Sequence, residues 1–427
     1  MLDKGQTMYN WIRDLFPINR SITGDGVRET LFYLKKIVPI KIKSVPTGYK
    51  AYDWTVPNEW KVKEAFIKDD QNKTIIDFKN NNLHLVSYST AINKTLTFKE
   101  LKNHLHTLPK QPNAIPYVTS YYKKNWGFCL EFNKYKKLDK SKKYKVFINS
   151  SLKKGKLNYG EIIIKGKVKK EIFISTYVCH PSMANNELSG PVLATMIAKI
   201  LLSQNNYFSY RIIYVPETIG SLVYLSKNFK KLKKNTVAGF NLTCVGDSKK
   251  FSFLPSRNGN TLADESSIYI LKKYVKKFIL YNWLNRGSDE RQYCSPGFDL
   301  PVVNVMRSKH GTYREYHTSL DNLDFVSKKG LQESLEIHLK IFKFIESNLF
   351  YKSNILGEPF LSKHNLHDSL NKNQNHYLLR KKILDFLSYA DGRKSLLEIS
   401  AIINVPFDEL KKIVDILFKK KIIRLND

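Results

Sequence analysis

Four short strings in the middle of the chain carry side chains suited to metal binding and proton transfer. They are CHPSMANNELSG with His180, VPETIGS with Glu217, RGSDERQY with Asp289 and Glu290, and YREYHTSLDNLDF with His317. Neutral imidazole and carboxylate oxygen are ligands that Zn²⁺ uses when cysteine does not bind it, and a catalytic zinc keeps one position for water. A glutamate beside that water can act as general base. The pattern predicts a metal-dependent hydrolase.

The four strings follow predicted buried strands. EIFISTYVCH and YRIIYVPE are continuous apolar runs typical of parallel strands covered on both faces, and VAGFNLTCVG and LPVVNVM are a third and a fourth. Helical periodicity marks GPVLATMIAKILLS, a segment from about Ser221, and LQESLEIHLKIFKFIESNLF. Strands and helices in alternation predict an α/β fold with a mostly parallel sheet flanked by helices. Sheets of this kind hold their sites at the carboxyl ends of the strands, which is where the strings lie.

The pattern divides the chain into three parts. Residues 1–48, which are largely helical, and residues 160–352 are predicted to form one α/β domain. Between them, residues 49–159 carry short β-branched and aromatic runs separated by Asn, Lys and Pro clusters, which indicates an inserted β-rich domain. Residues 370–427 show three helices and then the short strand KKIIRL, an order that resembles a winged helix.

The amino-acid composition indicates which binding partners and which cellular compartment to expect. The 427 residues include 71 Lys+Arg and 38 Asp+Glu, a formal net charge of +33, which suggests nucleic acid or a membrane surface. The lysines are dispersed, however, and the last fifty residues hold no arginine-rich recognition helix, so specific nucleic-acid binding is not expected and only the winged helix could provide it. No apolar run approaches the roughly 18 residues of a membrane span. Four scattered cysteines and no signal-peptide core predict a cytoplasmic protein without membrane contact.

Together the strings resemble the zinc aminopeptidase superfamily. Its pattern is a His after one strand, then Asp-Asp-Asn-x-Ser-Gly, Glu-Glu-x-Gly and a late Tyr-His-Thr-x-x-Asp, and NELSG and YHTSLDNLD match it well. GSDERQY resembles the Ser-Asp-His-x-x-Phe loop of the same superfamily. More closely, the chain is similar to bacterial aminopeptidase-like proteins that carry FPINRSITGDGVRETL, HPSxANxxLSG, PETIG and HGTYxEYHTSLDN. These proteins have an inserted β-rich domain and a C-terminal winged helix. The resemblance covers essentially the whole chain and implies a zinc-aminopeptidase-like α/β fold.

Two carboxylates of the superfamily pattern are missing. Asn186 stands where the superfamily has the Asp that bridges two zinc ions, and Glu187 follows it. Thr243 stands where a further Asp is expected. A neutral amide does not bridge two cations as a carboxylate does, so the resemblance with these departures implies about one zinc per chain.

The PETIG string allows two alignments with the superfamily. Alignment on Gly220 makes Glu217 the general base and places Thr218 at a metal-binding position, whereas alignment on Pro216 makes Glu217 a ligand.

The resemblance implies a zinc-dependent hydrolase of a small peptide or amide substrate. The implied metal ligands are His180, Asn186, Asp289 and His317, and the implied catalytic residues are Glu217, Glu187 and Glu290. Four arginines could hold a substrate carboxylate or phosphate, or equally form ion pairs: Arg20, Arg257, Arg291 and Arg307. Two alternatives stay open, a degenerate peptidase that binds a ligand or regulates, and a single-zinc cyclase or amide hydrolase acting on a metabolite. A homo-oligomer also stays open.

Overall fold

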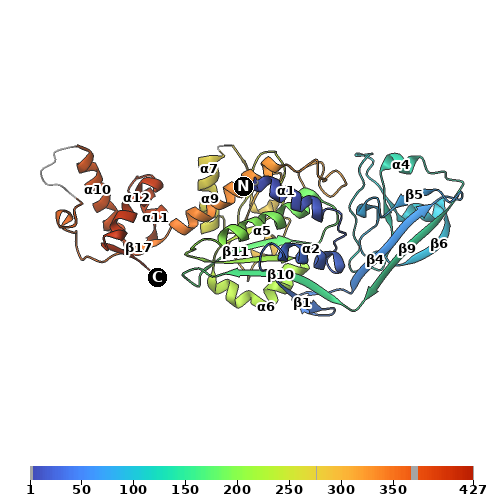
Figure 1. Ribbon diagram of the computed structural model, residues 1–427, viewed down its shortest axis with the longest axis horizontal. Coiled ribbons are helices and arrows are strands. Elements are labelled where there is room, and N and C mark those ends of the chain that lie inside the picture. The colour runs from blue at the N-terminus through green and yellow to red at the C-terminus, as the bar shows by residue number, and fades with distance from the viewer. Residues whose placement is uncertain (1–2, 276, 367–373, 427) are drawn as a thin grey trace. The chain divides into compact units, whose positions relative to one another are not determined.

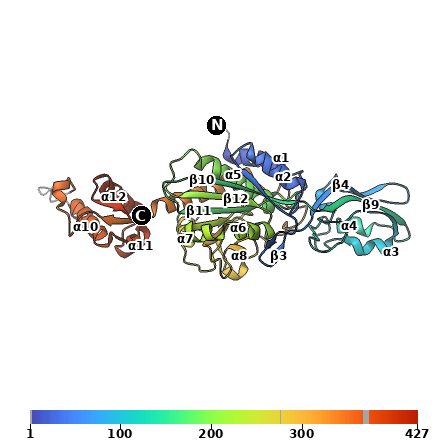
Figure 2. The same cartoon turned by 90° about the horizontal axis from the view of Figure 1, so that it is seen from below.

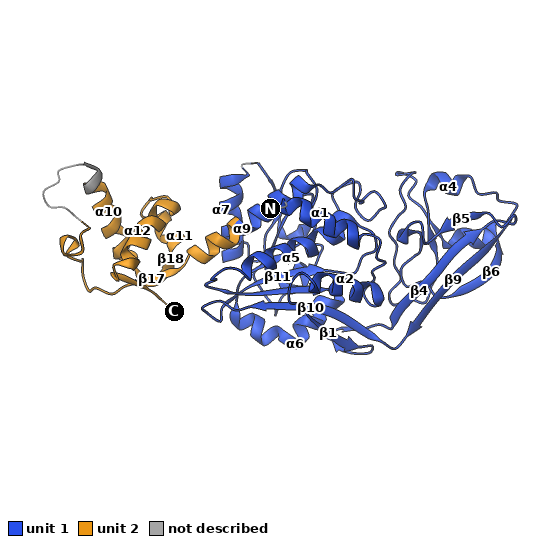
Figure 3. Cartoon of the chain, in the orientation of Figure 1, with its two compact units in different colours: residues 1–339 blue, residues 340–427 orange. Residues whose placement is uncertain are grey.

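The computed structural model describes residues 3–275, 277–366 and 374–426, and the chain divides into two compact units. Unit 1 comprises residues 1–339 and unit 2 comprises residues 340–427 (Figure 3). No helix in the described part of the chain is long and apolar enough to cross a bilayer.

Unit 1 is built on an eight-stranded sheet whose central strands are parallel, as predicted. Strand β11 pairs in parallel with β12 on one side and with β13 on the other, and β13 pairs in parallel with β16. Strands β1 and β10 add an antiparallel edge, and β14 is antiparallel to β16. The strands, in sheet order, are β1 (Lys41–Pro46), β10 (Lys156–Ile164), β12 (Ser209–Val215), β11 (Glu171–Tyr177), β13 (Thr236–Asn241), β16 (Val302–Met306), β14 (Ser252–Leu254) and β15 (Ile279–Leu280).

Helices cover both faces of this sheet. In Figure 1, α1 and α5 lie on one side of it and α6 lies on the other. Strand β11 is buried along its whole length because it lies between these layers, which explains its continuous apolar sequence. The helices of unit 1 that frame the sheet are α1 (Lys4–Leu15), α2 (Asp25–Lys35), α5 (Ser189–Leu201), α6 (Ile219–Asn235), α7 (Leu262–Tyr274) and α8 (Glu290–Tyr293), and α9 (Lys328–Ser347) follows them.

A second, antiparallel sheet forms from the segment predicted to be an insertion. Its strand order is β5-β4-β9-β6, and the short pair β7–β8 forms from the same segment. The other short pair, β2–β3, lies beside α6 of the large-sheet part (Figure 2). The bounds are β2 (Lys50–Ala51), β3 (Trp54–Thr55), β4 (Glu59–Lys68), β5 (Thr74–Asp77), β6 (Ile92–Thr97), β7 (Leu105–His106), β8 (Phe128–Cys129) and β9 (Lys143–Lys153), with the short helices α3 (Phe98–Leu101) and α4 (Phe132–Lys136). Strand β10 begins at Lys156 and already belongs to the large sheet, so the chain returns to that sheet slightly before residue 160.

Unit 2 combines three helices with a three-stranded antiparallel sheet. The elements are β17 (Phe350–Ser353), α10 (Gln374–Tyr389), β18 (Asp391–Ser395), α11 (Leu396–Ile402), α12 (Phe407–Lys419) and β19 (Ile423–Leu425), and β17 lies between the other two strands. Strand β17 precedes residue 370, where the sequence analysis began this part. A four-residue strand followed by a long loop carries too little pattern to be assigned from sequence.

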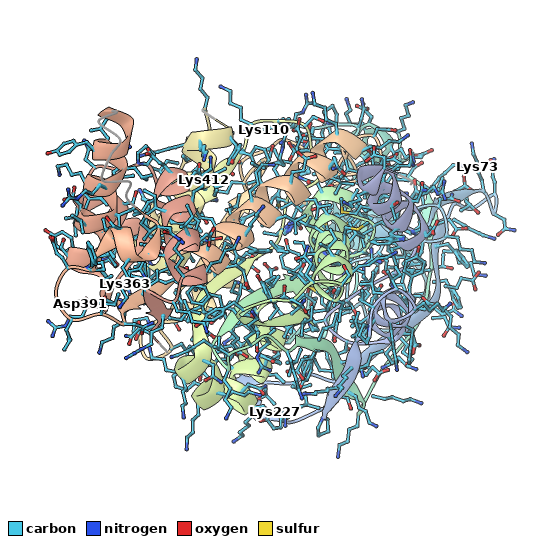
Figure 4. The ribbon with its side chains drawn as sticks, turned by 60° about the vertical axis from the view of Figure 1, so that its left-hand side comes forward. Lys73, Lys110, Lys227, Lys363, Asp391 and Lys412 are labelled. Carbon is cyan, nitrogen blue, oxygen red and sulfur yellow. The ribbon has the colours of Figure 1, made fainter. Side chains whose placement is uncertain are left out.

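Lysine side chains project from many separate elements. The labelled lysines in Figure 4 include Lys73 in the turn after β4, Lys110 in a loop and Lys227 on α6, and each extends away from the ribbon. The positive charge is therefore spread over solvated positions rather than gathered by one element.

Candidate active site

A pocket of about 240 Å³ opens at the carboxyl ends of β11 and β12. The large sheet contributes residues that directly follow its strands, and the inserted segment contributes the opposite, mostly aromatic side. The lining residues are Ile22, Trp54, Tyr117, Thr119, Tyr121, Tyr122, Cys179, His180, Glu217, Thr218, Ile219, Arg291 and His317. Three of the seven site residues predicted from sequence are among them: His180, Glu217 and His317.

His180 follows β11 and is fixed from behind by two buried charges. Its Nδ1 lies 2.9 Å from Oε2 of Glu187, which sits on the short helical turn before α5. The Nε of Arg20 lies 3.4 Å from the other oxygen of Glu187 and donates to the backbone oxygen of His180 at 2.9 Å. Burial alone would lower the pKa of His180, but the hydrogen bond and charge of Glu187 raise it above its ordinary value. This contact orients the ring and directs Nε2 toward the pocket.

Glu217 faces His180 from the end of β12. Its Oε2 lies 3.6 Å from Nε2 of His180, and its Oε1 accepts a hydrogen bond of 2.9 Å from the hydroxyl of Ser288. Burial raises the pKa of Glu217, although the charge of His180 and the bond from Ser288 oppose the rise. The next residue, Thr218, has a φ of 63°, an uncommon left-handed conformation that turns the chain sharply at this point.

Asp289 supports that turn from outside the pocket. Its Oδ1 accepts from the backbone nitrogen of Thr218 at 2.7 Å and from the hydroxyl of Ser221 at 2.9 Å. Burial, together with the charge of Glu217, raises the pKa of Asp289 to about 8. Asp289 thus holds the backbone that presents Glu217, and it is absent from the pocket lining.

Glu290 is also fully buried and organises a loop. One of its oxygens accepts from the backbone nitrogens of Gly287 at 2.7 Å and Ser288 at 3.0 Å, and the other accepts from the amide of Asn241 at 3.2 Å. Gly287 passes so close to His310 that a Cβ there would lie 2.8 Å from the imidazole. The carboxylate therefore fixes the loop that carries Ser288 to Glu217, and it does not reach the pocket.

His317 completes the pocket from the loop after β16. Its ring lies 5.4 Å from that of His180, centroid to centroid, and stacks on Tyr316 at 3.9 Å. Burial and the nearby imidazoles of His180 and His310 lower the pKa of His317 to about 3, so its ring is neutral. Its Nε2 is buried and has no hydrogen-bond partner among the described residues. A neutral imidazole nitrogen without a partner is suited to binding a cation.

Asn186 and Thr243 are buried outside the pocket lining. The amide nitrogen of Asn186 donates to the hydroxyl of Tyr177 at 2.6 Å, and its backbone nitrogen donates to Asp321 at 2.9 Å. The hydroxyl of Thr243 donates to the backbone oxygen of Asn186 at 3.1 Å. Neither residue lines the pocket.

One group of three described residues places metal-type ligand atoms within 4.8 Å of one another: Cys179, His180 and Glu187. These atoms do not fit a metal ion. Glu187 already occupies Nδ1 of His180, and Arg20 places a buried positive charge beside that carboxylate. Burial also raises the pKa of Cys179 well above its ordinary value, so the thiol stays protonated rather than becoming the thiolate that binds metals.

The pocket side of His180 fits a metal better. Nε2 of His180, Oε2 of Glu217 and the unpartnered Nε2 of His317 belong to three lining residues. The two imidazole nitrogens are ligands of the kind that zinc prefers, and the carboxylate beside them can serve as a further ligand or as a base. Glu187 stands behind His180 as the outer partner that metal-binding histidines usually have.

The aromatic residues of the inserted segment were missed by the sequence analysis. The Tyr117 ring lies 5.2 Å from the rings of both His180 and His317, and its backbone nitrogen donates to His317 at 2.9 Å. Tyr121 and Tyr122 line the pocket as well. The tyrosine-rich string YVTSYY was the available signal, but nothing in the sequence shows which distant segment it contacts.

Comparisons with known proteins agree with this architecture. A protein-family model described as a domain of unknown function (DUF4910) matches residues 9–348, and a winged helix-turn-helix model matches residues 349–425. A protein of Clostridium acetobutylicum named "Putative polysaccharide biosynthesis protein with aminopeptidase-like domain" is 41% identical over 424 residues, which are 99% of this chain and 97% of that protein.

Solved structures show the same fold. The crystal structure of a "putative peptidase" from Clostridium acetobutylicum has a TM-score of 0.89 at 41% identity and covers 99% of this chain and 96% of its own. A zinc aminopeptidase from Bacillus subtilis has a TM-score of 0.58 at 14% identity, covering 80% of this chain and 95% of its own. At that identity the likeness concerns the fold alone.

Proposed function

The chain belongs to the aminopeptidase-like family described as DUF4910, and we propose that it is a metal-dependent hydrolase of a small amide or peptide bond. One observation carries this proposal. Nε2 of His180 faces Glu217 across 3.6 Å inside the pocket, while Glu187 and the buried Arg20 fix the opposite side of the imidazole. Burying the charges of Glu187 and Arg20 is energetically unfavourable, and in return they hold Nε2 of His180 toward the pocket.

The proposed cofactor is one zinc ion per chain, held by His180 and His317. When bound, zinc supplies Lewis acidity toward a carbonyl oxygen and lowers the pKa of a water molecule. The other two ligands implied by the resemblance are left out of this set. Asn186 and Asp289 do not line the pocket, although Oδ1 of Asn186 and Oδ2 of Asp289 have no hydrogen-bond partner among the described residues.

Glu217 is the proposed general base. Its Oε2 faces the pocket, and Ser288 holds its Oε1 in place. Because burial raises its pKa, the carboxylate is a better proton acceptor near neutral pH than an exposed glutamate. Glu217 takes a proton from the attacking water, the C–N bond breaks, and the same carboxyl group returns the proton to the leaving nitrogen.

Glu187 and Glu290 take supporting roles instead of the catalytic roles implied by the resemblance. Glu187 is fully buried behind His180, and Glu290 is fully buried under the loop that carries Ser288. Neither carboxylate lines the pocket, so neither can touch a substrate there.

The name of the Clostridium acetobutylicum relative places that protein in polysaccharide biosynthesis. Among the substrates that fit the proposed chemistry, this favours an acyl amide on a sugar over the N-terminal bond of a peptide.

Elemental analysis of the full-length protein tests the proposal together with hydrolysis of a panel of N-acyl amides. We expect about one zinc per chain. His180→Ala and His317→Ala should each lose the metal, whereas Glu217→Gln should keep it and lose activity. Glu29→Gln, an exposed glutamate outside the pocket, is the matched control. Two tightly held metals, or metal retained in His317→Ala, would contradict the assignment, and metal lost in Glu217→Gln would make Glu217 a ligand.

A second candidate is a ligand-binding protein without catalysis. Asn186 and Thr243 favour it, because they replace carboxylates that the resemblance leads one to expect. A purified protein that holds no metal and hydrolyses no amide of the panel would support this alternative.

A further inference from the structure

Arg291 is the one Lys or Arg among the described residues that line the pocket. Its Nη2 donates a hydrogen bond of 2.8 Å to the hydroxyl of Thr218, which directly follows Glu217. Within the described chain its guanidinium forms no ion pair. The other three candidate arginines each pair with a carboxylate: Arg20 with Glu187, Arg257 with Asp299 and Arg307 with Glu333.

Arg291 therefore differs from its counterparts in having charge and donors to spare. A guanidinium presents five N–H donors in a planar fork, and Thr218 uses one of them. The fork matches the two oxygens of a carboxylate, which it can bind through two parallel hydrogen bonds. The charge of Arg291 acts on the carboxyl groups of Glu217 and Asp289, but it forms no close ion pair with either, so the guanidinium at the edge of the pocket can still bind an anion supplied by a ligand.

The inserted segment adds an aromatic wall to the same pocket. Trp54 and Tyr122 have exposed fractions of 38% and 56%, and their ring centroids lie 6.0 Å apart in an edge-to-face arrangement. Tyr117 and Tyr121, whose hydroxyls lie 2.8 Å apart, continue this wall toward the imidazoles. Exposed aromatic faces in a pocket gain from burial against an apolar or ring-shaped group of a ligand.

We propose that Arg291 makes the pocket selective for small ligands that carry a carboxylate, with an apolar or ring-shaped group against Trp54 and Tyr122. The single guanidinium balances one negative charge. A phosphate would bring more charge close to Glu217, which repels it. The pocket volume of about 240 Å³ accommodates a small molecule.

The reaction is the amide hydrolysis of the proposed function, on which this inference rests, and Arg291 adds the class of its substrate. Because Arg291 contacts the residue next to Glu217, a carboxylate bound there lies close to the proposed base. The substrate is then an acyl amide with a carboxylate a few bonds from the amide, such as an N-acylated amino acid or an N-acylated acidic sugar.

Isothermal titration calorimetry of the full-length protein tests the selectivity without any hydrolysis. The probes are phenylacetate, the neutral alcohol phenylethanol and phenyl phosphate, none of which contains an amide bond. Wild type should bind phenylacetate at least about tenfold more tightly than phenylethanol, since a charge-assisted bidentate contact is among the stronger hydrogen-bonded contacts. Arg291→Gln should remove that preference, and Arg291→Lys should keep part of it.

Arg286→Gln is the matched control. Arg286 belongs to the same loop region and is exposed, but it packs over the ring of Trp283 and does not line the pocket. This variant should keep the wild-type preference.

Three results would overturn the inference: no binding of phenylacetate by wild type, an unchanged preference in Arg291→Gln, or tighter binding of phenyl phosphate than of phenylacetate. Failure of the proposed function would be seen in a different experiment, as a rate of amide hydrolysis that is unchanged in Glu217→Gln.

Discussion

The pairing of Arg20 with Glu187 predicts a large loss of stability in Glu187→Gln. Both side chains are fully buried, and the Nε of Arg20 lies 3.4 Å from the nearer carboxylate oxygen. The hydrogen bonds of the guanidinium all go to neutral acceptors, the backbone oxygens of Leu15 and His180 and the hydroxyl of Thr30, and the contact with Glu187 is an ion pair without a hydrogen bond. Neutralising Glu187 therefore leaves a buried cation without its buried partner charge, and among the described carboxylates only the exposed Glu29 still acts on it.

Breaking a buried ion pair by removing one charge costs about 3–5 kcal/mol. The lower end applies here, because the separation of 3.4 Å is longer than a strong charge-assisted hydrogen bond. Glutamine also preserves the volume, and its oxygen can still accept from Nδ1 of His180. We expect the free energy of unfolding to fall by about 3 kcal/mol.

Urea unfolding followed by tryptophan fluorescence, in the presence of a chelator, measures this change. All five tryptophans precede residue 340, so the signal reports on unit 1. Glu29→Gln is the matched control, because Glu29 also acts on Arg20 through its charge but is exposed. That variant should stay within about 0.5 kcal/mol of wild type. A loss below about 1 kcal/mol in Glu187→Gln would refute the reasoning, because the buried cation would then not depend on this carboxylate.

Two further predictions follow from the charges. The pKa of Asp289 is raised to about 8, so between about pH 4 and pH 8 the folded state binds a proton that the unfolded state has released. Asp289 should therefore contribute an unfolding free energy that falls as the pH rises through this range, and Asp289→Asn should give a slope that is less negative, or more positive, than that of wild type; equal slopes in metal-free urea titrations would contradict the raised pKa. Helix α12 carries Asp408, Glu409 and Asp415 among its lysines, so full-length protein should bind labelled duplex DNA weakly and without sequence preference, with log K falling by about 0.9 per phosphate contact against log salt. Sequence-selective binding tighter than about 10⁻⁷ M at physiological salt would contradict it.

The sequence by itself determined the parallel strands at the centre of the large sheet. Strands such as β11 are buried on both faces and therefore consist of uninterrupted apolar residues, which makes them visible without a structure. The carboxyl ends of parallel strands meet at one edge, so His180 and Glu217 could be placed together from sequence. The three helices of unit 2 were visible in the same way, through their apolar periodicity.

The tertiary structure alone decided which way the polar side chains point. Asn186 and Glu187 follow His180 within seven residues, and Asp289 and Glu290 directly precede Arg291, yet each of the four side chains hydrogen-bonds away from the pocket. Adjacent residues on a turn project in different directions, and no periodicity records which one faces the pocket. The positions of the strand ends in the sequence show where the site lies, but only the directions of the side chains show which residues face the pocket.

The aromatic wall depended on contact between distant segments. Tyr117 donates its backbone hydrogen to His317, two hundred residues later in the chain, and Trp54 comes from another strand pair of the inserted segment. Sequence patterns report local periodicity and composition, because these follow from the burial of neighbouring residues. The packing of an irregular loop against the end of a sheet depends on the shapes of both surfaces, and only the folded chain brings these surfaces together.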